Sequence, residues 1–241
     1  MLQKTEAIVL KAIKYGDQKL IVDFYTEELG YLSCAVRLST TQRGKMKKFL
    51  FQPLTLLLLE VDVRQSRQLQ TLGDVQFSHP LPGITGDCFK MSQAMFLSEM
   101  LWYATRQEQA DRQLFTFIRE SIKWFDSTAL PVANFHLCFL LRLTEYLGFH
   151  PLIEDWQPHH YFDMMQGTFS LQVPFHNEFL RPEESAYMPL LLRMRYRNMH
   201  LYRFSREQRQ HCLNLIIKYY RMHLPSLPEL KTLDVLHELY D

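Results

Sequence analysis

Apolar positions in the first 77 residues follow the two-residue period of β-strands. Five short runs show this pattern, and turn-forming residues such as Gly16 and Gly30 punctuate them. The runs span residues 6–15, 20–26, 27–36, 53–63 and 67–77. The first run is largely apolar on both faces, as expected for the wall of a small closed barrel. We therefore predict a five-stranded Greek-key barrel of the OB type, although an SH3-like barrel fits the pattern nearly as well.

The pattern changes at residues 78–87, where two prolines and two glycines end the strand-like period. Beyond this break, apolar residues recur at spacings of three and four, which indicates helices. The predicted helices span residues 88–107, 112–127, 132–148, 181–194 and 205–224, and residues 228–241 close the chain. We expect Gly148 to end the third helix and Ser205 to cap the fifth. The prediction is a β + α two-domain protein, with the barrel at residues 1–79 and an all-helical domain at residues 80–241.

Charge is distributed unevenly between these two parts. The whole chain has a formal net charge of +1, so it is not a polyelectrolyte binder as a whole. Residues 1–79 carry 11 Lys and Arg against 8 Asp and Glu, whereas the remaining residues carry 16 against 18. Any affinity for nucleic acid is therefore expected on the barrel.

The basic excess is concentrated in the stretch RLSTTQRGKMKKFLF at residues 37–51, which contains no acidic residue. Its five cations are Arg37, Arg43, Lys45, Lys47 and Lys48. They repel one another, and no acidic residue nearby offsets this repulsion. On an OB-like barrel, such a stretch is better explained as a contact with a phosphate backbone than as a solvated turn. Phe49 and Phe51 are expected to anchor the return of this loop to the barrel. Charge alone does not choose between DNA and RNA.

Aromatic residues accompany the predicted strands. They are Tyr15, Phe24, Tyr25, Tyr31, Phe49 and Phe51. Strands favour aromatic residues in any case, so most of the six are expected in the core. One or two are candidates for stacking on nucleic-acid bases.

The sequence contains no constellation typical of an enzyme. Gly44-Lys45 is similar to part of a phosphate-binding P-loop. That motif needs a glycine at position 39 and a serine or threonine at position 46, where this sequence has Ser39 and Met46. There is no G-x-S-x-G motif for a hydrolase nucleophile. We predict no catalytic residue and no cofactor.

Metal binding was considered for His159 and His160, which lie near Asp155 and Asp163. No H-x-x-x-H or H-E-x-x-H spacing is present. We therefore expect these histidines to lie in a loop or to be partly buried, and not to bind a metal ion. The four cysteines form no C-x-x-C pair, which favours a reduced, intracellular protein. The charged N-terminus is unlike a signal peptide, and the apolar run LTLLLLEV is too short to span a bilayer. We expect a soluble cytoplasmic protein.

Several segments together resemble the bacterial RecO family of DNA repair proteins. The hallmarks are a T-E-x-I-V-L opening, a Y-G-D turn, a T-x-E-x-G-x-L-S turn and Q-P-L-T-L-L, in this order within the first 77 residues. The C-terminal part agrees more loosely, through LGFHP at residues 147–151 and YYRMHL at residues 219–224. Coverage is nearly the whole chain, and is weakest at residues 90–130 and 155–215.

One departure concerns the segment after LGFHP. Many members of the family carry four cysteines there, in a zinc-ribbon-like site, whereas this sequence has none. The segment YFDMMQGTFSL still predicts a hairpin about Gln166-Gly167, within a degenerate zinc-ribbon-like region at about residues 155–175. We expect the hairpin to be held without metal by aromatic residues, with zinc at His159 or His160 as the alternative. Those aromatic residues are Trp156, Tyr161, Phe162 and Phe169.

The resemblance implies a non-enzymatic mediator of recombinational repair in the bacterial cytoplasm, associated with the nucleoid. Such proteins bind single- and double-stranded DNA and anneal complementary strands. They also engage the acidic C-terminal tail of the single-stranded-DNA-binding protein, and with RecR they help to load the RecA recombinase. Two alternatives remain open: a protein–protein adaptor without nucleic-acid binding, and an RNA-binding OB protein.

The resemblance also suggests where contacts lie. The positions matched to DNA contact are Lys19, Arg37, Arg43, Lys45, Lys47, Lys48, Arg64 and Arg67. In the helical part we expect an apolar groove with a basic rim for the acidic tail. The arginine-rich run at residues 193–209 is a candidate for that rim or for a second DNA contact. Its candidate residues are Arg193, Arg195, Arg197, Arg203 and Arg206.

Overall fold

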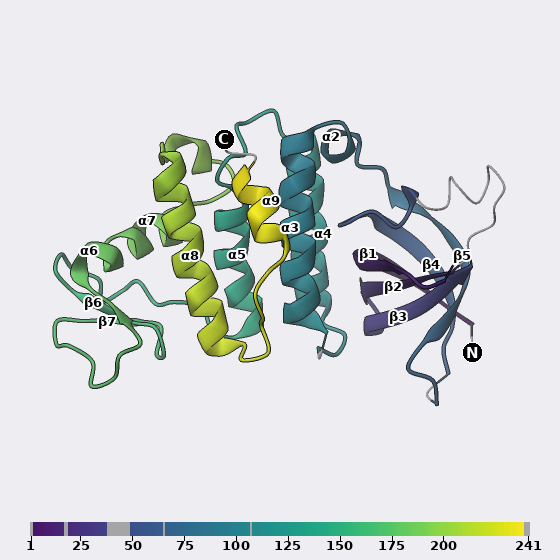
Figure 1. The fold of residues 1–241 in the computed structure, drawn as a ribbon, viewed down its shortest axis with the longest axis horizontal. Helices are drawn as coiled ribbons and strands as arrows, with labels where there is room; N and C mark the ends of the chain where they lie inside the picture. The colour runs from purple at the N-terminus through teal and green to yellow at the C-terminus, as the bar shows by residue number, and fades with distance from the viewer. Residues whose placement is uncertain (1, 17–18, 38–48, 65, 107, 239–241) are drawn as a thin grey trace. The chain divides into compact units, whose positions relative to one another are not determined.

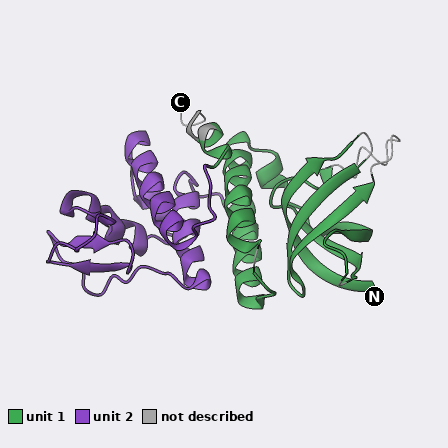
Figure 2. Ribbon diagram, turned by 60° about the horizontal axis from the view of Figure 1, so that its bottom comes forward, with its two compact units in different colours: residues 1–128, 230–239, 241 green, residues 129–229, 240 purple. Residues whose placement is uncertain are grey.

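The computed structural model describes residues 2–16, 19–37, 49–64, 66–106 and 108–238. Contacts divide the chain into two compact units, shown in different colours in Figure 2. Unit 1 holds residues 1–128 and the returning segment 230–239, and unit 2 holds residues 129–229. The proposed domain boundary between residues 79 and 80 marks where strands give way to helices, and as a domain boundary it stays a prediction.

Five strands of unit 1 form a closed barrel, in the order β1-β2-β3-β5-β4 (Figure 1). The strands are β1 (Leu2–Lys14), β2 (Lys19–Thr26), β3 (Gly30–Arg37), β4 (Leu56–Asp62) and β5 (Gln70–His79). All neighbouring pairs are antiparallel except β3 and β5, which run parallel. This closed five-stranded arrangement confirms the predicted OB-type barrel.

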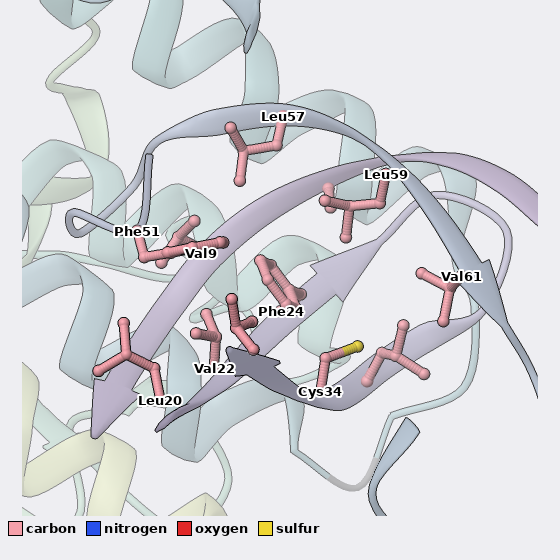
Figure 3. Packing of buried hydrophobic residues seen from close by; sticks show 12 residues of the cluster. Val9, Leu20, Val22, Phe24, Cys34, Phe51, Leu57, Leu59 and Val61 are labelled. Carbon is pink, nitrogen blue, oxygen red and sulfur yellow. The ribbon is translucent and has the colours of Figure 1, made fainter. Parts of the chain in front are cut away.

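The barrel interior is filled by alternate side chains of these strands (Figure 3). Val22, Phe24 and Cys34 are completely buried there, because every second residue of a strand points to the same face. Phe51 is 4% exposed and meets Phe24 edge to face, with ring centroids 6.3 Å apart. It anchors the chain after the basic stretch, as expected. Phe49 does not, because its side chain is 65% exposed.

The described helices of unit 1 are α2 (Pro82–Thr85), α3 (Cys88–Thr105), α4 (Arg112–Ser127) and α9 (Thr232–Glu238). Asp87 caps α3 and Asp111 caps α4 by accepting hydrogen bonds from the first-turn N–H groups. The one-turn helix α2, which lies within the predicted break, was not predicted. Glu99 on α3 accepts hydrogen bonds from the Thr232 N–H and hydroxyl, and so fixes the start of α9.

Helix α3 contacts the barrel at a β-bulge in β1. The pairing of β1 with β2 shifts between Val9 and Lys11, so the backbone there leaves its regular ladder. The Ser98 hydroxyl of α3 donates to the carbonyl of Leu10 at 2.5 Å. The helix therefore satisfies an acceptor at the irregular point of the strand.

Unit 2 begins with α5 (Phe135–Leu147), which ends at Gly148 in the left-handed conformation, as predicted. A small sheet follows, with strand order β7-β6-β8. Its strands are β6 (Tyr161–Asp163), β7 (Thr168–Ser170) and β8 (Phe179–Leu180). The predicted helix at residues 181–194 is divided into α6 (Pro182–Ser185) and α7 (Tyr187–Arg193), and η1 (Met199–Leu201) precedes α8 (Arg206–His223). Ser205 and Gln208 form a complete capping box at the start of α8.

The predicted hairpin is confirmed, and aromatic residues hold it. Phe162 of β6 is fully buried, with its ring centroid 4.9 Å from that of Phe169 and 5.8 Å from that of Tyr219 on α8. Gly167 turns the chain at φ +67°, and a Cβ there would lie 2.6 Å from the Tyr219 hydroxyl. Glycine is therefore required at this turn both by backbone conformation and by space.

Candidate nucleic-acid interface

Lys19 and Arg37 lie directly opposite each other on β2 and β3. Both side chains are exposed on the outer face of the barrel. Directly opposite residues of an antiparallel pair have Cβ atoms about 5 Å apart, and like charges in this arrangement are destabilising. Two of the predicted DNA contacts are thus brought together, in a pairing that a polyanion would relieve.

Both cations line a groove of about 590 Å³, which we call the β3–β5 groove. β3 and β5 pair only at Cys34 with Gln70 and at Ala35 with Thr71, and the groove lies beside that short seam. Its other lining residues are Ala35, Val36, Thr71, Leu72, Gly73 and Val75. Among the described residues that line it, none is acidic, and Lys19 and Arg37 are its two cations.

The loop between β4 and β5 carries the exposed residues Arg64 and Arg67. Gln70, which is 6% exposed, holds this loop. Its side chain accepts a hydrogen bond from the Arg64 N–H at 2.9 Å, and donates to the carbonyls of Arg64 at 3.1 Å and Arg67 at 2.5 Å. The Arg64 guanidinium is ion-paired with Asp62 at 2.9 Å, so part of its charge is already offset.

The β4–β5 loop leads into the same seam as the Lys19–Arg37 pair. Gln70 lies beside Cys34, three residues before Arg37 on β3. At about 3.3 Å per residue, the loop joins the seam roughly 10 Å along the strand from Arg37. The sequence did not predict the role of Gln70. The only signal there is a polar residue at a strand position that should face the barrel interior.

The other predicted contacts of the basic stretch, Arg43, Lys45, Lys47 and Lys48, lie outside the described residues. Their contact with DNA stays a prediction. The described residues on either side are Arg37, in the β3–β5 groove, and Phe49.

The other end of the β2–β3 outer face is occupied by α3. The Trp102 indole N–H donates to the Asp23 carboxylate at 2.7 Å, and the Ser33 hydroxyl donates to the same carboxylate at 2.5 Å. Burial and the nearby charge of Asp23 raise the pKa of Tyr31 to about 12. This end is therefore a packing surface, and Tyr31 is not presented for stacking.

Three of the six barrel aromatic residues are buried, so the prediction that most of them lie in the core is only half met. Phe24, Tyr25 and Phe51 are buried, whereas Tyr15 is 64% exposed and Phe49 is 65% exposed. Exposure thus reduces the stacking candidates of the sequence to these last two residues.

In unit 2, two residues of the arginine-rich run donate hydrogen bonds to backbone carbonyls. Arg195 donates from Nη1 to the carbonyls of Leu192 and Met194, at 2.5 and 2.9 Å. Arg209 donates to the Asn134 side chain at 3.0 Å and to the Phe204 carbonyl at 3.1 Å. The contacts of Arg195 satisfy carbonyls at the C-terminal end of α7, whereas those of Arg209 connect α8 with Asn134 and with the segment before α8. Arg195, one of the predicted contacts, therefore has a structural role.

The remaining candidates of this run present their side chains differently. Arg193 is exposed and its guanidinium lies 5.7 Å from the centroid of the Trp156 ring, where a cation–π attraction applies. Arg197, Arg203 and Arg206 are exposed. A contact of these four with DNA or a partner stays a prediction.

A zinc-ribbon site does not fit the residues of the hairpin. Residues 149–181 contain no cysteine. Within the described part of the chain, no group of three or more His, Cys, Asp or Glu is arranged to hold a metal ion. Asp163 instead accepts hydrogen bonds from the N–H groups of Met165 and Gln166, and lies 3.1 Å from His176. Hydrogen bonds and aromatic packing hold this hairpin.

Three of the four thiols are buried. Burial raises the pKa values of Cys34, Cys138 and Cys212 to about 12, so these thiols stay protonated at neutral pH and are poor nucleophiles. Of the helices that the structure describes, none combines the length and apolar character needed to cross a membrane.

The chain combines a closed OB-type barrel, which carries cations along one seam, with a helical unit. These features define a class of two-part barrel proteins with a candidate nucleic-acid interface. Residues 1–81 match the family model described as "Recombination protein O N terminal", and residues 85–233 match "Recombination protein O C terminal". The chain belongs to the RecO family.

Relatives of the same family match over the full chain. DNA repair protein RecO of Bacteroides fragilis is 42% identical over 242 residues, covering 100% of both chains. That of Phocaeicola vulgatus is 41% identical over 240 residues, again with 100% of both covered. That of Flavobacterium psychrophilum is 34% identical over 239 residues, with 98% of each chain covered. The chain is thus a homologue of DNA repair proteins, and the predicted non-enzymatic role agrees with this family.

Proposed function

We propose that the protein is a recombination mediator that binds single- and double-stranded DNA and anneals complementary strands. With RecR and the single-stranded-DNA-binding protein, it would help to load RecA. The observation that carries the proposal is the pair of opposed cations, Lys19 and Arg37, in a groove on a RecO-family barrel whose described lining residues include no acid. The bacterial cytoplasm, at the nucleoid, is the expected location.

Annealing requires no nucleophile or general base. It requires cations that neutralise two phosphate backbones at once, so that bases of opposite strands approach and pair. Lys19 and Arg37 supply two of these charges, and the loop held by Gln70 adds Arg64 and Arg67. Because that loop is hydrogen-bonded in place before DNA arrives, less ordering is needed on binding.

We propose that partners contact unit 2. The exposed arginines Arg197, Arg203 and Arg206 fit the basic rim expected for an acidic protein tail, or a second DNA contact. Arg195 is left out of this proposal because its Nη1 already donates to two carbonyl oxygens.

The test is a fluorescence-anisotropy titration with labelled single-stranded DNA at low and moderate salt. The double variant Lys19→Glu/Arg37→Glu should bind at least about tenfold more weakly, with a salt slope smaller by about 1.4 for the two lost phosphate contacts. The matched control Arg112→Glu/Lys123→Glu reverses two surface charges of α4 and should bind like the wild type.

Two results would contradict the proposal. Failure of the wild type to bind DNA even at low salt would favour a protein–protein adaptor. Preference for RNA over DNA of the same sequence, in competition, would favour an RNA-binding barrel. The triple variant Lys45→Glu/Lys47→Glu/Lys48→Glu tests the basic stretch separately, and wild-type annealing by that variant would remove it from the interface.

A further inference from the structure

The strand register places Tyr15 beside the two cations of the β3–β5 groove. Its backbone N–H donates to the Lys19 carbonyl at 2.9 Å, so the two residues continue the pairing of β1 with β2 beyond the end of β1. Lys19 in turn lies opposite Arg37 on β3. These three residues form one row across β1, β2 and β3, which are neighbours in the barrel (Figure 1). We call it the tyrosine row. Residues 17 and 18, in the turn between Tyr15 and Lys19, lie outside the described residues.

All three side chains of the tyrosine row are exposed, and the exposed fraction of Tyr15 is 64%. Residues directly opposite each other in a sheet point to the same face, so the ring and the two cations share the outer face of the barrel. Neighbouring strands are about 4.8 Å apart, which gives the row a length of roughly 10 Å. Because successive phosphates of a stacked strand are about 3.4 Å apart along its axis, the row matches about three nucleotides.

A second row, two residues further along the same strands, is apolar. Ile13 lies opposite Ile21, and Ile21 lies opposite Ala35. Ile13 is 46% exposed, and the other two are partly exposed. Since every second residue of a strand returns to the same face, this apolar row adjoins the tyrosine row. Ala35 also lines the β3–β5 groove, so both rows are continuous with that groove.

Helix α3 limits this surface on the side away from the tyrosine row. The next row along the strands consists of Lys11, Asp23 and Ser33. Trp102 of α3 packs on it, since its indole N–H donates to Asp23 at 2.7 Å and the Lys11 Nζ lies 3.7 Å from its ring centroid. Between α3 and the end of the strands, the surface therefore presents an aromatic ring, two cations and a short apolar strip.

Single-stranded DNA matches this combination. Its phosphates are attracted to Lys19 and Arg37, and an unpaired base has a flat face that stacks on an aromatic ring. A duplex keeps the faces of its bases stacked inside, so only its phosphates can reach the tyrosine row. An acidic peptide would pair with the two cations but would make no use of a ring beside them.

We propose that Tyr15 stacks on an unpaired base of single-stranded DNA whose phosphates lie on Lys19 and Arg37. This inference rests on the proposed function and deepens it, because it names a residue that distinguishes single strands from duplex. The two cations contact backbone charge common to both forms, whereas the ring of Tyr15 acts only on exposed bases.

The experiment compares wild type with Tyr15→Ala by anisotropy, on a single-stranded oligonucleotide, a duplex and an abasic strand of equal length. The variant should bind the single strand about tenfold more weakly, because stacking on one base contributes strongly to affinity. Binding to the duplex and to the abasic strand should be unchanged. The salt slope should also stay the same, since no charge is removed.

Three further variants make the result specific. Tyr15→Phe keeps the ring and should bind the single strand like wild type, whereas Tyr15→Leu keeps an apolar side chain without a ring and should lose most of the same affinity. Phe175→Ala is the matched control, because Phe175 is a fully exposed aromatic residue of unit 2 and should not affect binding. Because Tyr15 is largely exposed, Tyr15→Ala should unfold at the same temperature as wild type.

The inference is overturned if Tyr15→Ala binds the single strand normally, or if it loses duplex and abasic binding to the same degree. It is also overturned if Tyr15→Leu binds like wild type, which would indicate an apolar contact without stacking. Loss of affinity in Tyr15→Phe would identify the hydroxyl as the contact and would overturn it as well. A wild type that binds no DNA would instead overturn the proposed function, so the two failures are distinguishable.

Discussion

The β3–β5 groove and the arginine-rich run at residues 193–209 are both rich in cations, but they use them differently. In the groove, Lys19 and Arg37 stand on the outer face of neighbouring strands. In the run, the guanidinium groups of Arg195 and Arg209 donate to backbone carbonyls and to the Asn134 side chain. Arg195 is exposed as the groove cations are, but it and Arg209 also stabilise the fold through these hydrogen bonds.

The difference follows from secondary structure. A strand in a sheet has its carbonyls paired with its neighbours, so a cation on its outer face finds few local acceptors. A helix leaves its last four carbonyls without a partner, and a long basic side chain nearby bonds to them. The density of charge in a sequence therefore does not measure how much of it is available for a ligand.

The largest effect is expected from removing the amide that organises the arginine-rich run. Asn134 is 4% exposed and donates to the carbonyls of Met199 and Tyr202, at 3.0 and 2.8 Å, while accepting from Arg209. Asn134→Ala leaves these groups without their partner and should lower the free energy of unfolding by about 3 kcal/mol. Urea denaturation measures this change. The surface variant Arg203→Ala should stay within about 0.5 kcal/mol of wild type, and equal loss in both would contradict this account.

A smaller effect is expected from the corresponding residue of the barrel. Gln70→Ala removes three hydrogen bonds that hold the β4–β5 loop, and should lower the free energy of unfolding by about 2 kcal/mol. Gln70→Glu keeps the acceptor for the Arg64 N–H but loses both donors, so its stability should be reduced as well. If the loop must be ordered to bind, both variants should also weaken DNA binding in the anisotropy assay. Wild-type stability of Gln70→Ala would show that water replaces these bonds.

The barrel was largely predictable from the sequence. Period-two alternation is a local signal, and it located five strands because each of them covers one small core. Helix ends were equally readable at Gly148 and Ser205, where one residue type satisfies a specific backbone requirement. The helix α2 and the strand β8 were missed because four and two residues are too few to show any period.

The candidate site was less predictable. The sequence indicated which residues are cationic, but not that Lys19 and Arg37 are register partners or that Arg195 bonds to the end of α7. It also placed Phe49 with Phe51 as an anchor, although one is exposed and the other buried. These properties depend on pairing and packing between segments far apart in the chain, which no local pattern records.

The comparison of the two cation sets is tested directly by single alanine variants. Arg195→Ala should lower the free energy of unfolding by about 1 kcal/mol, because the end of α7 loses two hydrogen bonds that water only partly replaces. Lys19→Ala should leave stability unchanged or slightly raised, because it removes a like-charge pair. For DNA binding, Lys19→Ala should have the larger effect of the two variants. Its salt slope alone should be smaller by about 0.7. If the two variants behaved alike in both assays, the distinction between cations that stabilise the fold and cations that bind DNA would be wrong.

The smallest expected effect is a pH dependence in unit 2. Burial lowers the pKa of His150 below its ordinary value of 6.5, Glu145 opposes this shift, and the positive charge of Arg195 adds to it. The unfolded chain therefore binds a proton more readily than the folded one. The stability contributed by neutral His150 is complete above about pH 6.5 and is lost as the pH falls towards the folded-state pKa.

This dependence gives Arg195 a second measurable consequence. His150→Gln should flatten the fall in unfolding free energy between about pH 7 and pH 5, by less than about 1 kcal/mol. In Arg195→Ala, the pKa of His150 followed by NMR titration should move upwards, because one of the charges that opposes protonation is gone. Lys19→Ala serves as the control, since Lys19 is absent from the charges that shift His150. An unchanged His150 titration in Arg195→Ala would mean that the guanidinium, although fixed at the end of α7, has its charge screened by solvent.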